Sequence, residues 1–349
     1  MGPNKMTMRK AIFGNLLVIA ISLVVSVAVA EFVCRFLPFT NDTDPAYKLA
    51  HPVLPFVMRP NSESVSLQGH VIKTNSQGLR DFEYSVQKPS GTFRILVLGD
   101  SVSYAYGQDM ENGFAKVLER QLNAAQDKRY KSVEVINAAH NGFHILDQYN
   151  YLRLYGLAYS PDALIIGINS SHFAAESQSV IIKDGVDFAP GSAWLRWGIP
   201  PWVKRVLRRS YLYMTIGTAY RNRVYEGSNA GGQAAVVDEE SRKIAETTAA
   251  HLDEMLSLAA KNALPIYFVY QPNRRETTSG SYEAPMLVQL IRDRESQGGL
   301  IYVDTLRDFQ KFAQNTNEVF PVTDGAHPNA KGHRILADGL FNQLAAKIR

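Results

Sequence analysis

The sequence predicts an α/β fold with three layers, α/β/α, in which helices cover both faces of a five-stranded, mainly parallel sheet. Two observations predict it. Short apolar runs rich in β-branched residues alternate with longer stretches in which apolar residues recur at helical spacing. Polar or turn-forming residues follow the first three runs at once, as they do where core strands end. The five runs occupy residues 94–98, 133–136, 163–168, 266–270 and 300–304.

The stretches between these runs are expected to be helices. In residues 111–125, Phe114, Val117, Leu118 and Leu122 form an apolar stripe along one face of a helix. The other helical stretches are 145–157, 238–261, 284–296 and 330–348. Strands separated by helices imply βαβ units with right-handed crossovers, which make neighbouring strands parallel.

The composition is that of a globular chain, and it argues against several classes of protein. Apolar residues make up 46% of the 349 positions and charged residues 20%. The net charge of +4 comes without a dense basic stripe interleaved with aromatics, so we expect no nucleic-acid partner. The single cysteine, Cys34, cannot form an intrachain disulfide and has no metal-ligand spacing around it. We expect neither a metal nor another cofactor.

An apolar segment near the N-terminus predicts a membrane anchor. Residues 11–30 are almost wholly apolar, and a helix of about 20 residues spans the ~30 Å hydrocarbon core of a bilayer. Lys5, Arg9 and Lys10 precede the segment. The positive-inside rule therefore keeps residues 1–10 in the cytoplasm and places the rest of the chain outside, in the periplasm or beyond the cell.

A cleaved signal peptide is the alternative, because Ala28-Val-Ala30 matches a small-x-small cleavage site. We favour a single-pass anchor retained over residues 11–36. The reason is that the apolar helix can continue beyond that site, through Phe32, Val33 and Phe36.

Two segments lie outside the α/β pattern. Residues 37–92 begin as a polar, proline-containing stalk and continue as short alternating pieces, which predict a small β-rich module beside the main sheet. Residues 93–349 form the α/β domain, with an insertion at about 171–237 that holds all three tryptophans among basic residues. The insertion is open to three interpretations: a substrate lid, a membrane-surface helix, or a satellite core with a solvated basic face.

The candidate catalytic residues of the chain follow the ends of predicted strands. The stretch Arg94-Ile-Leu-Val-Leu-Gly-Asp-Ser-Val-Ser103 places Ser101 just after the first core strand, where open α/β sheets bind ligands. A serine nucleophile needs a base that a third group orients. Asp324 and His327 supply such a pair in one short loop before the last helix. A metal site built on that pair would lack an obvious third ligand.

Two more polar positions follow the next two strands. Gly142 closes the turn that begins at the end of the second strand, and Asn169 ends the third. In a parallel sheet both would meet Ser101 at one edge. His140 and His144 lie near the same turn and are not expected to act in catalysis.

Together these residues resemble the SGNH hydrolases, also called the GDSL esterase/lipase family, over roughly residues 93–349 without the insertion. The four matching blocks, in chain order, are Gly99-Asp100-Ser101-Val102, Asn137-Ala-Ala-His-Asn-Gly142, Gly167-Ile-Asn169-Ser170 and Asp324-Gly-Ala-His327. The first has Val where many members have Leu. The third has Ser170 where the family usually has Asp, which puts the local support of that loop in question.

The resemblance implies a role for each of these residues and a fold of the SGNH, flavodoxin-like type. Ser101 would attack an acyl carbonyl, His327 would take its proton, and Asp324 would orient the imidazole. The backbone amides of Ser101 and Gly142 and the side-chain amide of Asn169 would form the oxyanion hole.

The resemblance and the anchor together imply a membrane-anchored enzyme of bacterial type. Its activity would be serine-dependent hydrolysis of carboxylic (acyl or acetyl) esters, on an O-acylated glycan or a lipid outside the cytoplasm. An O-acyltransferase would use the same residues to modify an extracellular polysaccharide or cell-envelope glycan, beside an envelope or polysaccharide-export partner. A non-catalytic carbohydrate-binding subunit of an envelope assembly is the third hypothesis, and the complete triad argues against it.

Overall fold

The computed structural model describes residues 5–36, 48–65, 70–125, 129–173, 181–184, 186–188, 193–217, 219, 239–322 and 324–348. The chain divides into two compact units, Met1–Asn41 with Trp202–Gly232, and Asp42–Pro201 with Gln233–Arg349. Most of the predicted polar stalk, at 37–47, lies outside the described residues, as does the end of the predicted insertion at 220–237.

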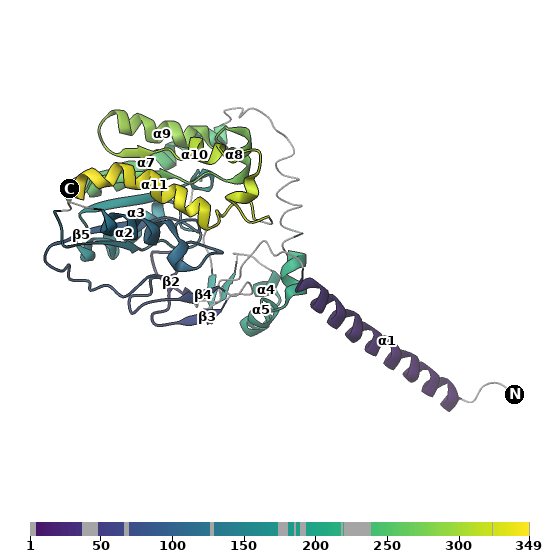
Figure 1. The fold of residues 1–349 in the computed structure, drawn as a ribbon. Helices are drawn as coiled ribbons and strands as arrows, with labels where there is room; N and C mark the ends of the chain where they lie inside the picture. The colour runs from purple at the N-terminus through teal and green to yellow at the C-terminus, as the bar shows by residue number, and fades with distance from the viewer. Residues whose placement is uncertain are drawn as a thin grey trace. The chain divides into compact units, whose positions relative to one another are not determined.

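The larger unit is built on a five-stranded sheet in which every strand runs parallel to its neighbours (Figure 1). In spatial order the strands are β11 (Ile301–Val303), β10 (Ile266–Tyr270), β7 (Ala163–Ile168), β5 (Thr92–Leu98) and β6 (Ser132–Asn137). The predicted five-stranded parallel sheet is confirmed, and each strand end lies within two residues of its expected position.

The central position of β5 explains why residues 94–98 are an apolar run and where Ser101, just after the strand, is located. All seven of its residues are buried, since helices cover both faces of the sheet. Its side chains alternate between two cores: Leu96 and Leu98 join one, Ile95 and Val97 the other. The chain passes from β5 to β6 on one side and later to β7 on the other. In open α/β sheets, ligands bind where the strand order reverses in this way, beyond the carboxyl ends of the strands, here β5 and β7.

Helices cover the two faces, as the three-layer prediction requires (Figure 1). One face carries α3 (Ile145–Leu154), α7 (Glu239–Lys261) and α9 (Pro285–Ser296), the other α2 (Phe114–Ala124) and α11 (Ala330–Ile348). On the first face Leu152, Leu252 and Leu287 pack in the core that contains Leu96. On the second, Leu118 of α2 packs in the core that contains Ile95.

Shorter elements complete this unit. They are η1 (Met110–Asn112), η2 (Gly156–Tyr159), η3 (Ser170–His172), β8 (Ile181–Lys183), β9 (Val186–Phe188), α4 (Ala193–Arg196), α8 (Arg274–Ser279), α10 (Leu306–Gln310) and η4 (Thr316–Glu318). The segment before β5 forms two small antiparallel pairs, β1 (Lys48–Leu49) with β2 (Val57–Met58) and β3 (Glu63–Val65) with β4 (Val71–Lys73). Leu54, Phe56 and Ile72 from this β-rich module share the core of the main sheet.

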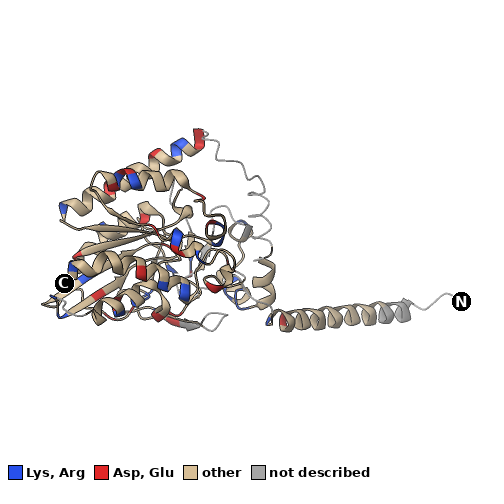
Figure 2. Ribbon diagram, turned by 45° about the horizontal axis from the view of Figure 1, so that its top comes forward, with Lys and Arg blue, Asp and Glu red and all other residues tan. Residues whose placement is uncertain are grey.

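The smaller unit contains the long N-terminal helix α1 (Lys5–Cys34) and most of α5 (Pro201–Leu207). Residues Ile12–Cys34 of α1 have a mean hydropathy of 2.7, and no residue of the most apolar 18-residue window of the helix is buried. In Figure 2 the part of the α1 ribbon coloured by residue type is tan until its C-terminal end. The acidic residue of this end in the sequence is Glu31. By length and composition this helix can cross a membrane; a signal sequence would pass the same test.

Candidate active site

The chain turns sharply where β5 ends, and Ser101 lies in that turn. Gly99 has no room for a side chain, because a Cβ there would overlap the Ser103 hydroxyl. The amide of Val102 donates to the Asp100 carboxylate at 3.0 Å, which closes the turn. Ser101 is held half-buried at the carboxyl edge of the sheet.

Asp324 and His327 reach Ser101 from the loop before α11. His327 Nε2 lies 2.9 Å from Ser101 Oγ, and His327 Nδ1 lies 2.7 Å from Asp324 Oδ2. The backbone amides of Ala326 and His327 donate to the other oxygen of Asp324 at 2.8 and 3.0 Å. The loop therefore fixes its own carboxylate, and Ser101, His327 and Asp324 form one continuous hydrogen-bonded chain. With the proton on Nδ1, facing Asp324, Nε2 can accept the proton of Ser101.

The charges around His327 make it a stronger base than a free imidazole. Burial lowers its pKa, but the carboxylates of Asp324 and Asp100 outweigh burial, so the pKa lies above its usual value of 6.5. Burial raises the pKa of Asp324, but the imidazole and the loop amides outweigh that effect, so it lies below 3.8. Asp324 is therefore ionised at neutral pH and can stabilise a protonated His327.

Gly142 and the turn that carries it lie at the same edge, after β6. The φ of Gly142 is +81°, a conformation in which a side chain would be strained, and the space beside its Cα is open. The amide of His140 in the same turn donates to the carbonyl of Gly99 at 3.1 Å. This bond ties the Gly142 turn to the end of β5, two residues before Ser101.

Asn169, at the end of β7, is bonded to Asp100, the residue before Ser101. Its Nδ2 donates to Asp100 Oδ2 at 2.7 Å. Its Oδ1 accepts from the amide of Ser171 at 3.0 Å and from the Ser171 hydroxyl at 2.6 Å. Ser170 takes no part in this support, and its hydroxyl lies 3.4 Å from Glu283. The support expected from an Asp at position 170 thus comes from Asp100 and Ser171.

Several solved hydrolases resemble this chain in structure. An alpha/beta hydrolase enzyme from the metagenome of Lake Arreo, Spain, is 15% identical, with a TM-score of 0.45 over 74% of this chain and 96% of its own. A lipolytic protein of the G-D-S-L family from Veillonella parvula is 10% identical, with a TM-score of 0.43 over 72% and 97%. A catalytic mutant of an acetylxylan esterase from Geobacillus stearothermophilus is 14% identical, with a TM-score of 0.44 over 72% and 94%. Neither the family models nor the curated protein sequences compared with this chain give a match.

Sequence reasoning missed Arg80 and Tyr106, which brace the site from outside the four blocks. Arg80 is buried and donates to the carbonyls of Tyr104 and Ala105 at 3.1 and 2.8 Å, and to that of Gln108 at 2.6 Å. It therefore holds the loop that follows Ser101. Tyr106 in this loop packs its ring on the imidazole of His327, with ring centroids 4.7 Å apart. Arg80 belongs to the turn-rich stretch 74–81, which ends in charged residues, and no local pattern in that stretch predicts its contact with the loop after Ser101.

The other histidines near the site contact groups other than Ser101 and Asp324. Burial lowers the pKa of His140 and of His172 to about 4, and that of His333 to about 3. Their rings bond the Ala138 carbonyl, the Gln148 side chain and the Phe114 amide, respectively. His144 begins α3, where its amide donates to the Asp147 carboxylate. Among the described residues, no group of His, Cys, Asp and Glu is placed to hold a metal ion.

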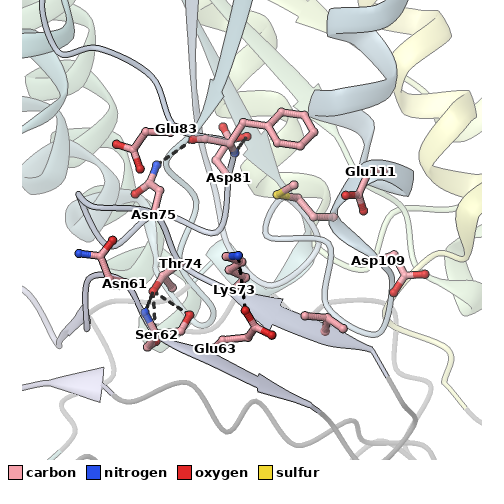
Figure 3. A pocket seen from close by; sticks show the side chains of 13 residues that line it. Asn61, Ser62, Glu63, Lys73, Thr74, Asn75, Asp81, Glu83, Asp109 and Glu111 are labelled. Carbon is pink, nitrogen blue, oxygen red and sulfur yellow. Dashed lines mark hydrogen bonds and ion pairs between the residues drawn. The ribbon is translucent and has the colours of Figure 1, made fainter.

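A cavity of about 820 Å³ lies on the β-rich module, and it is not lined by Ser101, Asp324 or His327 (Figure 3). Its walls come from β3, β4, the loop around Asn75 and the stretch Asp109–Glu111 that leads into α2. Lys73 pairs with Glu63 at 3.4 Å, and the other charged side chains labelled on the walls are carboxylates. Such a wall suits solvent better than the acyl group of an ester.

Proposed function

We propose that this chain is a serine esterase that hydrolyses acyl or acetyl esters outside the cytoplasm. The hydrogen-bonded chain from Ser101 through His327 to Asp324 carries the proposal. A serine hydroxyl becomes nucleophilic when an oriented base accepts its proton, and these distances meet that requirement. The site also lies beyond β5 and β7, where strand order reverses.

In the first half of the reaction, Ser101 Oγ attacks the acyl carbonyl while its proton passes to His327 Nε2. The tetrahedral intermediate then collapses: the ester C–O bond breaks, and the proton on Nε2 goes to the departing alcohol. The acyl group remains on Ser101. Asp324 stabilises the imidazolium without taking the proton itself.

In the second half, water replaces the alcohol. His327 Nε2 accepts a proton from the water as it attacks the acyl-serine, and then returns a proton to Ser101 Oγ, so the acid leaves and the enzyme is restored. An acceptor hydroxyl on a sugar would follow the same path as water and give a transferred acyl group. Hydrolysis and transfer thus differ only in which hydroxyl reaches the acyl-enzyme.

We assign the oxyanion hole to the amides of Ser101 and Gly142 and to Asn169 Nδ2. The amide nitrogen of Asn169 has two hydrogens, and the 2.7 Å bond to Asp100 uses one of them and sets the plane of the group. The other hydrogen remains for the substrate oxygen. Loss of one such donor typically costs about 2.7–4 kcal/mol of transition-state stabilisation.

The enzyme would be held at the outer face of a membrane by α1. The basic residues before the apolar stretch keep the N-terminus inside, so the α/β domain follows on the outside. This position suits substrates outside the cell membrane, such as O-acylated glycans or lipids.

The test is turnover of p-nitrophenyl acetate by the purified full-length protein, with and without sugar acceptors, with Ser101→Ala as the control. Release of nitrophenol by the wild type alone, with free acetate as product, is the expected result. Acetylated sugar as the main product would make the enzyme an acyltransferase. A folded wild type that forms neither product contradicts the proposal and favours a binding subunit.

A further inference from the structure

Glu31 near the end of α1 is bonded to a distant part of the chain. Its carboxylate accepts three hydrogen bonds: from the Ser210 hydroxyl at 2.7 Å, from the Tyr211 amide at 2.8 Å and from the Leu212 amide at 3.0 Å. Residues 211–217 are helical, so the carboxylate satisfies amides that lack a partner within the first helical turn. Arg35 adds a second contact, with its guanidinium 5.6 Å from the centre of the Tyr211 ring.

Residues 201–217 are here called the juxtamembrane segment. The hydrogen bonds to Glu31 attach this segment to α1 near the C-terminal end of the helix. Glu31 lies in the last turn of the apolar stretch Ile12–Cys34, roughly 5 Å along the helix axis before Cys34. If α1 crosses a bilayer, Glu31 marks the level at which the helix leaves the hydrocarbon. The juxtamembrane segment, bonded to Glu31, must then lie at the level of the lipid headgroups.

The juxtamembrane segment exposes apolar side chains and carries basic residues, of which Arg209 is exposed and Lys204, Arg205 and Arg208 are half-buried. Trp202 and Val206 are 62% and 58% exposed, and Ile216 is 62% exposed. Trp202 and Val206 are four residues apart on α5 and therefore lie on one face. Four basic residues occur in the segment, Lys204, Arg205, Arg208 and Arg209, and no acidic residue occurs between 201 and 217.

We propose that the juxtamembrane segment lies on the lipid surface at which α1 leaves the bilayer, and that anionic headgroups are its partner. Trp202, Val206 and Ile216 would enter the boundary between headgroups and acyl chains, where tryptophan is favoured. The basic residues would meet lipid phosphates, since anionic lipids attract cationic segments within a Debye length of the surface. The inference rests on the proposed crossing of the membrane by α1, and it assigns the basic aromatic insertion to the membrane.

Lipid is a better partner than a protein for this surface because α1 itself brings it there. The exposed apolar side chains and the exposed apolar helix α1 belong to the same compact unit, joined through Glu31. One bilayer would cover both. The uniform positive charge of the segment complements phosphate headgroups without requiring a particular shape.

The three tryptophans of the chain, Trp194, Trp197 and Trp202, make the test direct. Full-length protein carrying Trp194→Phe and Trp197→Phe keeps Trp202 as its only tryptophan. It is reconstituted into vesicles of phosphatidylcholine with a minority of phosphatidylglycerol. We expect the emission of Trp202 to be shifted to the blue. Lipids brominated near the headgroup end of the acyl chain should quench it strongly, and aqueous acrylamide should quench it weakly.

In the same background, Glu31→Ala should remain in the vesicles but lose most of the quenching by brominated lipid. Glu240→Ala, a change at an exposed carboxylate on α7, is the matched control and should keep it.

Flotation of the vesicles separates this proposal from the membrane anchor. Protein that floats with the vesicles but exposes Trp202 to acrylamide overturns the surface proposal and leaves the anchor standing. Protein that does not float overturns both. The blue shift could also appear without lipid and grow with protein concentration. That result would assign the surface to a second copy of the chain and also overturn the proposal. Hydrolysis of p-nitrophenyl acetate by each variant checks that the α/β domain is folded and reports on the esterase separately.

Discussion

His327 is the residue on which the proposed chemistry depends most. Its two ring nitrogens are bonded to different partners, Asp324 at 2.7 Å and Ser101 at 2.9 Å. Only the neutral imidazole can accept the serine proton. Because the carboxylates of Asp324 and Asp100 raise the pKa of His327, the imidazole stays protonated to a higher pH than usual. The activity should therefore rise with pH as His327 loses its proton.

Asp324→Asn tests this coupling. The value of kcat should fall, on the order of 10⁴-fold if the loss is as large as in serine protease triads. The acid limb of kcat/KM should also move to lower pH, because the variant lacks the negative charge that raises the pKa of His327. Profiles of kcat/KM against pH for both proteins provide the measurement. An acid limb at the same pH in both would assign that limb to another group.

Asn169 should contribute to the transition state more than to substrate binding. Asn169→Ala is expected to lower kcat by about 10²–10³-fold with a much smaller change in KM, because the bond to the oxyanion strengthens as charge develops. Asn169→Asp should be at least as damaging, since it sets a second carboxylate against Asp100, which now lies 2.7 Å from the amide.

A matched control separates catalysis from stability for Asn169. Asn123 on α2 bonds the backbone of Val133 with both ends of its amide, at 2.7 and 3.0 Å, and is not part of the site. Asn123→Ala should lower the melting temperature and keep kcat. If Asn169→Ala behaves like Asn123→Ala, then Asn169 is a structural residue and the oxyanion assignment fails.

At the residue scale, the sequence predicts which residues could react but not which residues support them. Ser101 follows a recognisable core strand, and the spacing of Asp324 and His327 allows one loop to present both. The residues that support them do so through tertiary contacts between distant parts of the chain. Asp100 reaches Asn169 across 69 positions and Arg80 reaches the Ser101 loop across 24 to 28, and no local pattern encodes either contact.

At the scale of elements, the loop after β5 depends on the β-rich module that precedes it. Arg80→Met should remove three hydrogen bonds to the carbonyls of residues 104, 105 and 108. We expect a loss in unfolding free energy on the order of 3 kcal/mol, because buried carbonyls lose a charged donor. We also expect a lower kcat, because Tyr106 on this loop packs against His327. Urea unfolding and steady-state kinetics measure the two effects.

Arg80→Lys is the companion variant, since lysine keeps the charge but cannot bond three carbonyls in the plane of a guanidinium. It should recover part of the stability and less of the kcat. If Arg80→Met keeps the wild-type stability, then the loop holds its shape without Arg80.

The elements that were predicted best are those buried on both sides or strongly periodic. The sheet strands are continuous apolar runs because helices cover both faces, and α11 occupies residues 330–348, the predicted range. The sequence does not predict that β1 pairs with β2 and β3 with β4, because strands of two or three residues are too short to show an alternation of apolar and polar residues. Helix α8 was also missed: it is six residues long and is set by a capping box between Asn273 and Glu276, inside a polar stretch.

At the scale of the whole molecule, the chain combines an α/β unit with a unit that contains the apolar helix α1. The mature protein is expected to keep residues 1–30 and to fractionate with membranes, because the apolar stretch Ile12–Cys34 is long enough to span a bilayer. Mass spectrometry of the N-terminal peptide checks this, together with protease digestion of intact cells or spheroplasts. A mature chain that starts at Glu31 would identify the segment as a cleaved signal peptide.

The central claim is that Ser101 is a nucleophile activated by His327. Labelling with a fluorophosphonate probe tests it most directly, because the probe forms a covalent bond only with an activated serine. Wild-type protein should be labelled at Ser101, with the adduct located by mass spectrometry, and Ser101→Ala should remain unlabelled while melting near the wild-type temperature. His327→Ala should be labelled far more slowly. Equal labelling of wild type and Ser101→Ala would contradict the account and place the nucleophile elsewhere.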